Sequence, residues 1–118
     1  MRKKKDKLDL FIQLLSEAKF GSIVVIKDKK RLLSHTGDKK GPSAHIFIRS
    51  KKCIDDFFLK GDLGWAESYI EGNWDSPNLS DFLEWGALNF HEFTRFMRGK
   101  WYIIVYLRLR HMLNRNSK

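Results

Sequence analysis

The chain has 118 residues, of which 42% are hydrophobic and 31% charged, and its formal net charge is +9. This length suits one domain with a single core, and the composition excludes a disordered or collagen-like chain. The longest apolar run, WYIIVYL at 101–107, is far shorter than the roughly 20 residues of a transmembrane helix. No secretory signal peptide is recognisable, so we expect a chain that does not cross a membrane.

The positive charge lies at the two ends of the chain. Residues 1–7 contain five Lys or Arg and one Asp, whereas residues 93–118 contain seven Lys or Arg and no acid. Residues 8–92 contain 11 basic and 13 acidic residues. A polyanion, either nucleic acid or an anionic membrane, is therefore a candidate partner of the ends only, unless both are solvated tails. We divide the chain into a basic tail at 1–7, a folded domain at 8–92 and a basic, aromatic C-terminal segment at 93–118.

A helix and a hairpin are predicted at the start of the folded part. Apolar residues recur at helical spacing and predict an amphipathic helix over 6–18: Leu8, Phe11, Ile12 and Leu15. The β-branched run at 22–28 predicts a strand, which ends in the polar turn KDKK, and residues 31–35 predict the returning strand. A polar loop is expected at 36–42.

A third strand and a second helix follow this loop. Small and aliphatic residues alternate with others in 43–50, as in a half-buried strand: Ala44, Ile46 and Ile48 against His45, Phe47 and Arg49. The next apolar residues have helical spacing: Cys53, Ile54, Phe57 and Phe58. Gly61 stands where a C-terminal cap would end this helix.

The segment at 61–86 concentrates three tryptophans and six acidic residues in a basic chain. Residues 66–70 predict a short strand, which would place Glu67, Tyr69 and Glu71 on one face. A helix is predicted after it, with Ser76 or Asn78 as its N-cap. The glycines of the segment are expected where the backbone needs positive φ or a close approach: Gly61, Gly64, Gly72 and Gly86.

The C-terminal segment is compatible with two structures. Its Trp, Tyr, Ile and Val content is typical of a strand. We favour a helix, because it would place four apolar residues on one face: Phe93, Met97, Trp101 and Ile104. The complete pattern predicts an α+β domain, in which a small antiparallel sheet of three to four strands has flanking helices.

No catalytic or metal-binding constellation is recognisable in the sequence. The four histidines lack the paired spacing of metal ligands. Cys53 is the only cysteine, which excludes an intramolecular disulfide and favours a reducing compartment. It could be a nucleophile, but we favour a partly buried structural thiol. The acidic residues of 61–86 could perform acid–base catalysis or accept backbone hydrogen bonds in turns, and without a partner base, nucleophile or phosphate loop the second role is favoured. We therefore predict no catalytic residue, metal or cofactor.

Residues 61–85, GDLGWAESYIEGNWDSPNLSDFLEW, resemble a segment of the N-terminal, non-catalytic domain of cyclopropane-fatty-acyl-phospholipid synthases. The family pattern is G-x-L-G-x-x-E-x-Y-x-x-G-x-W-x-x-x-x-L, and Ser68 stands where it often has alanine. The stretch GPSAHIFIRSKKCIDDFFLKG is similar to that domain's strand and helix, and HMLNRNSK to its closing linker. The motif residues carried over are Gly61, Leu63, Gly64, Glu67, Tyr69, Gly72 and Trp74.

The resemblance implies a role outside catalysis. In that family the S-adenosylmethionine loop, the bicarbonate-holding residues and the catalytic acid lie in a methyltransferase domain after the linker. It therefore implies a stand-alone version of the non-catalytic domain, or that domain separated from its enzyme, with a fold similar to sterol-carrier-like domains. As a stand-alone chain it would be an accessory lipid-presenting subunit that supports a catalytic methyltransferase on a separate chain. The implied substrate class is unsaturated phospholipid. We expect a cytoplasmic protein that is peripherally associated with the inner face of the membrane.

The C-terminal segment interleaves aromatic and basic residues, as suits an anionic membrane interface. Each basic residue there contributes about 1 kcal/mol, and Trp and Tyr lie well at headgroup depth. The alternative is that these aromatic residues pack in the core or on a partner subunit. A small nucleic-acid-binding module is a second candidate function, disfavoured because no recognition motif is present and the middle of the chain is not basic. The residues expected to contact lipid are Arg95, Arg98, Lys100, Trp101, Tyr102, Tyr106, Arg108 and Arg110.

Overall fold

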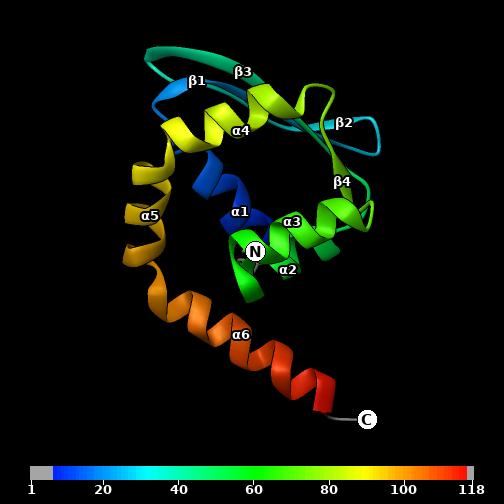
Figure 1. The fold of residues 1–118 in the computed structure, drawn as a ribbon. Helices are drawn as coiled ribbons and strands as arrows, with labels where there is room; N and C mark the ends of the chain where they lie inside the picture. Colours follow the sequence, from blue (N-terminus) through cyan, green and yellow to red (C-terminus); the bar gives the residue numbers. More distant parts are fainter. Residues whose placement is uncertain (1–6, 117–118) are drawn as a thin grey trace, which may run out of the picture.

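The computed structural model describes residues 7–116 and arranges them as a four-stranded sheet with helices around it (Figure 1). The predicted α+β class with flanking helices is confirmed. In chain order the elements are α1 (Lys7–Leu15), β1 (Phe20–Lys27), β2 (Lys30–Thr36), β3 (Lys39–Ile48), α2 (Lys52–Lys60), α3 (Asp62–Ile70), β4 (Trp74–Asp75), α4 (Leu79–Leu88), α5 (Phe90–Gly99) and α6 (Trp101–Asn116).

The sheet is mixed, so the prediction of a purely antiparallel sheet was wrong. Its strand order is β2-β1-β3-β4, and β1 is antiparallel to β2 but parallel to β3. After the hairpin, the chain passes the first residues of β1, and β3 then pairs with β1 on the side opposite β2. Gly37 allows this passage, because its N–H donates to the Gly21 carbonyl at 2.8 Å and a Cβ there would lie 2.2 Å from the Lys19 carbonyl oxygen. The loop expected at 36–42 is correspondingly shorter, since β3 begins at Lys39.

One hydrophobic core holds the sheet against the helices. The alternation predicted for β3 is confirmed, because Ala44, Ile46 and Ile48 are buried while Phe47 is exposed. Buried residues of α1, α2, α4 and α6 join the same cluster as β1 and β3. In Figure 1, α4 crosses the sheet and α5 leads down to α6, which runs along the side of the molecule away from the sheet. Much of α6 is therefore remote from the sheet core.

The short strand predicted at 66–70 is wrong, because these residues belong to helix α3. Gly61 has φ of 65° and turns the chain sharply between α2 and α3. The two helices then pack so closely that a Cβ on Gly64 would lie 2.0 Å from the carbonyl oxygen of Asp56. Glu67, Tyr69 and Glu71 consequently do not share the face of a strand. A helix-to-helix turn thus replaces the predicted helix-to-strand transition.

The other local predictions for 61–86 have mixed outcomes. Gly72 has φ of 85°, as expected, whereas Gly86 lies inside α4 with no atom within 4 Å of its ideal Cβ position, so the expectation for it was wrong. Asn78 is the N-cap of α4, because its Oδ1 accepts a hydrogen bond from the Asp81 N–H at 3.0 Å. That bond satisfies one of the free N–H groups of the first turn.

Asn89 joins the end of α4 to the start of β1 from a fully buried position. Its Oδ1 accepts from the N–H groups of Lys19 and Phe20 at 2.8 and 2.9 Å. Its Nδ2 donates to the carbonyls of Phe20 and Trp85 at 3.0 and 2.9 Å. Sequence analysis did not single out this residue, although a polar residue directly after an apolar helix is a recognisable cap signal.

Candidate functional site

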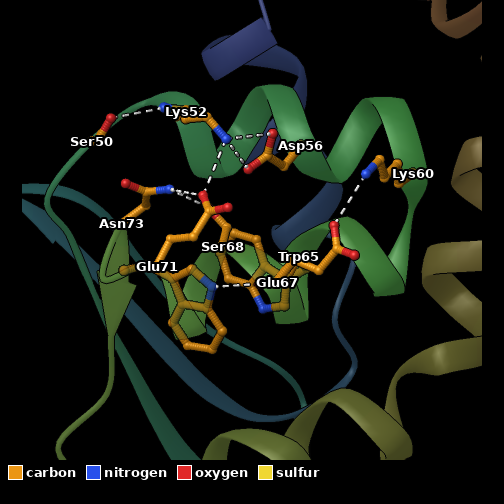
Figure 2. A network of polar contacts seen from close by, with 10 residues as sticks. Ser50, Lys52, Asp56, Lys60, Trp65, Glu67, Ser68, Glu71 and Asn73 are labelled. Atoms are coloured by element: carbon orange, nitrogen blue, oxygen red, sulfur yellow. Dashed lines mark hydrogen bonds and ion pairs between the residues drawn. The ribbon is translucent and has the colours of Figure 1, made fainter.

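Two acidic residues of the 61–86 segment, Glu67 and Glu71, form surface ion pairs that tie α2 to α3 (Figure 2). Lys52 Nζ lies 3.1 Å from Asp56 and 3.2 Å from Glu71, and these hydrogen bonds, that to Asp56 first, raise the pKa of Lys52. Lys60 Nζ lies 3.2 Å from Glu67. These groups pair with one another at an exposed surface and link the two helices at the α2–α3 corner.

The backbone hydrogen bonds expected of the acidic residues are present at one position and absent at another. Asp75 Oδ1 accepts from the N–H of Ser76 at 2.8 Å, as a turn carboxylate would. Glu67 instead pairs with the Lys60 side chain. Asn73 donates to the hydroxyl of the fully buried Ser68 at 2.8 Å and so fixes the turn that follows α3.

The aromatic residues of the same segment lie in the core or pack against it: Trp74 is buried, whereas Trp65 and Tyr69 are partly buried. Trp65 and Trp74 stack with ring centroids 4.3 Å apart, and Trp74 Nε1 donates to the Trp65 carbonyl at 2.9 Å. The Tyr69 ring lies 4.9 Å from that of Trp74. Among the motif residues Leu63 is the outward one, at 62% exposure. The structure therefore brings the motif together as a packed corner rather than as an open site.

Cys53 is buried and its thiol stays protonated at neutral pH. Desolvation, reinforced by Asp56 and Asp55, raises the pKa of Cys53 to about 12. A nucleophilic cysteine needs the thiolate form, so this environment is the opposite of an activating one. Within residues 7–116, no group of three or more His, Cys, Asp or Glu side chains is placed to hold a metal ion.

The C-terminal segment is helical, as favoured, but it is broken at Lys100 into α5 and α6. The break separates the set expected to share one face, because Trp101 is 64% exposed whereas Ile104 is buried. On α5, Arg95 pairs with Glu92, Arg98 is exposed, and the Lys100 ammonium lies 5.7 Å from the centre of the Phe96 ring. These basic residues therefore differ in how freely they could meet another molecule.

Helix α6 has one face on the domain and an opposite face of exposed apolar side chains. Ile104 and Leu107 are buried, and Arg108 Nε donates to the carbonyl of Phe58, which anchors the helix to α2. The exposed residues recur at helical spacing on the other side of α6. We call them the outer face of α6: Trp101, Tyr102, Val105, Tyr106, Leu109, Met112 and Leu113.

The outer face is larger than sequence analysis expected. Trp101, Tyr102 and Tyr106 were candidate lipid contacts and do lie together on it. The aliphatic members, such as Val105 and Leu109, were not predicted, because the expected contacts were aromatic and basic residue types. Their spacing of three and four residues was the available signal, but the same spacing also describes a core-facing stripe. Among the described residues, no helix has the length and apolar content needed to cross a bilayer.

Comparison with models of protein families, with curated proteins and with solved structures gives no match for this chain. The functional interpretation therefore depends on the site itself and on the resemblance carried by residues 61–85. Two features stand out: the outer face of α6, and a cavity between this helix and the start of α1 and α2.

Proposed function

We propose that this protein is a non-catalytic accessory subunit that binds an anionic phospholipid surface through the outer face of α6. The observation that carries the proposal is the continuous row of exposed apolar and aromatic side chains on this helix. Contiguous exposed apolar surface of this kind is typical of protein or membrane contacts. An amphipathic helix that lies in a membrane interface has this arrangement, with apolar residues entering the headgroup region.

Charge favours a lipid surface as the occupant of this face. Residues 93–118 contain seven Lys or Arg and no acid, so the helix is attracted to anionic headgroups. Trp101, Tyr102 and Tyr106 are residue types that favour the membrane interface. A nucleic acid is a less suitable partner, because a single-strand binder needs a basic groove beside its aromatic residues, whereas this face is mainly aliphatic and aromatic.

The lipid-presenting role completes the proposal. By the resemblance of residues 61–85, the protein supports an S-adenosylmethionine-dependent cyclopropane-fatty-acyl-phospholipid synthase whose catalytic methyltransferase is a separate chain. It would act in the cytoplasm, peripherally associated with the inner face of the membrane. The packed Trp65–Trp74 corner serves in this role as a scaffold of the domain.

Leu109→Glu should abolish binding to anionic vesicles. A carboxylate in the centre of the outer face would have to enter the headgroup region and would repel anionic lipids. The measurement is co-sedimentation with phosphatidylglycerol vesicles. Leu83→Glu is the matched control, because Leu83 on α4 is 59% exposed against 54% for Leu109, and the change in charge is the same. We expect this control to bind like the unmodified protein.

Two results would contradict the membrane-binding part. One is equal vesicle binding by the Leu109 and Leu83 variants. The other is tight binding of a random oligonucleotide without any binding to phosphatidylglycerol vesicles, which would favour the nucleic-acid module. Comparison with neutral phosphatidylcholine vesicles gives the electrostatic contribution to the binding affinity. We expect weaker binding to these vesicles.

The partnership is tested separately from membrane binding. Co-expression with a cyclopropane-fatty-acyl-phospholipid methyltransferase that lacks its own N-terminal domain should increase cyclopropane fatty acids in membrane lipids. The Leu109→Glu variant should give no increase, whereas Leu83→Glu should act like the unmodified protein. The accessory role fails if lipid methylation proceeds equally well in the absence of this chain.

A further inference from the structure

A cavity of about 530 Å³ lies between α6, the start of α1 and the start of α2. Its size falls within the range of roughly 300–1,000 Å³ that is usual for small-molecule sites. Leu8, Ile54 and Leu107 provide its apolar lining. The remaining lining is mainly basic, and this combination of an apolar wall with a few charged groups is typical of a ligand site.

The basic groups of the cavity come from three separate parts of the chain. Lys7 belongs to α1, Lys51 precedes α2, and Arg110 and His111 belong to α6. Among the described lining residues Asp55 is the one acid, and it is paired with Lys7 at 3.1 Å. Within residues 7–116, neither Lys51 nor Arg110 forms an ion pair. Among the described residues, the cavity therefore has two cations without an ion-pair partner, Lys51 and Arg110, which can receive an anion.

The ligand chemistry follows from these two cations. Arg presents a planar fork of N–H donors that suits the oxygens of a phosphate, and Lys adds a compact positive charge. The apolar lining suits the carbon part of an ester. We propose that this cavity binds a phosphate ester, with Lys51 and Arg110 holding its oxygens and Leu107 contacting its carbon atoms.

The position of the cavity relates the ligand to the outer face of α6. Tyr106 lines the cavity and also belongs to the outer face. A phosphate group at this rim would lie where the headgroups of a membrane meet the helix. That the phosphate is part of a phospholipid headgroup rests on the proposed function, whereas phosphate binding by the cavity does not.

The test compares Lys51→Gln/Arg110→Gln with Arg31→Gln/Lys40→Gln. Both double variants lose one Lys and one Arg charge, and Arg31 and Lys40 are exposed on β2 and β3, outside the cavity. Binding to phosphatidylglycerol vesicles should weaken by about tenfold or more in the cavity variant relative to the control, which corresponds to about 1.4 kcal/mol or more. Thermal unfolding of both variants verifies that each is folded.

Soluble probes distinguish the source of the phosphate. Titration with inorganic phosphate and with glycerol 3-phosphate, followed by calorimetry, should give heats of binding that the cavity variant loses if a free phosphate ester is sufficient. Loss of binding only with vesicles assigns the ligand to the lipid headgroup. The cavity proposal is overturned if the two double variants behave alike with vesicles and with both soluble probes. Failure of the proposed function looks different, because the unmodified protein would then bind no vesicles at all.

Discussion

Replacing Gly64 with alanine should destabilise the domain by about 3 kcal/mol or more, which is a large part of the total stability of a small protein. The added Cβ would lie 2.0 Å from the carbonyl oxygen of Asp56 and 2.7 Å from its carbonyl carbon. Both atoms belong to the backbone of α2, so no side-chain rotation can relieve the overlap. The two helices would have to separate, which would disturb packing around their buried residues, such as Phe58 on α2 and Ser68 on α3.

The measurement is urea unfolding followed by circular dichroism, with Gly86→Ala as the matched control. Gly86 is a helical glycine with no atom within 4 Å of its ideal Cβ position. Alanine there should increase stability by up to about 1 kcal/mol, because it restricts the unfolded chain and favours the helix. Similar effects of the two substitutions, in sign and size, would contradict the close packing of α2 and α3.

Asn89→Ala should be the second most damaging change, with an expected loss of about 3 kcal/mol or more of unfolding free energy. It removes four hydrogen bonds at once, from Lys19, Phe20 and Trp85. The N–H groups of Lys19 and Phe20 would lose their acceptor at a site that admits little water, and a buried donor without a partner costs roughly 1–3 kcal/mol. The start of β1 would then lose its hydrogen-bonded link to the end of α4, and apolar packing alone would join the two elements.

Two further variants separate this network from an ordinary helix cap. Asn78→Ala removes one exposed capping bond, to the Asp81 N–H, and should cost about 1 kcal/mol. Asn89→Asp keeps the acceptor of the two N–H groups but loses both donors and buries a charge, so it should also be strongly destabilising. Chemical unfolding of all three variants provides the comparison. A cost for Asn89→Ala no greater than that for Asn78→Ala would refute the central role of this residue.

Local sequence patterns were sufficient for the elements whose signals involve only neighbouring residues. The alternation around Ile46 predicted β3, the spacing around Ile54 predicted α2, and Asn78 is the cap of α4. They failed at residues 66–70, where a short apolar alternation is compatible with both a strand and a helix. The close approach of Gly64 to the backbone of α2 favours the helix, because one face of α3 can then pack against α2.

Long-range relations were beyond the sequence for a different reason. A hairpin pattern predicts an antiparallel pair of strands. The residues around the hairpin do not indicate whether β3 pairs with β1 or with β2. That choice depends on the passage of Gly37 beside β1, and so on contacts between residues that are distant in the chain. Asn89 is a similar case, because its value arises only when the end of α4 meets the start of β1.

The sequence by itself determined the α+β class, most of the helices and strands, the basic ends and the aromatic character of the C-terminal segment. Only the tertiary structure decided which apolar residues of that segment are buried. Periodicity states that side chains share a face of a helix, but whether the face meets the core or the solvent depends on what packs against it. Arg108 and Leu107 hold one side of α6 on the domain, which leaves Leu109 and its neighbours outside. The cavity beside Arg110 has the same origin, since its walls come from three distant parts of the chain.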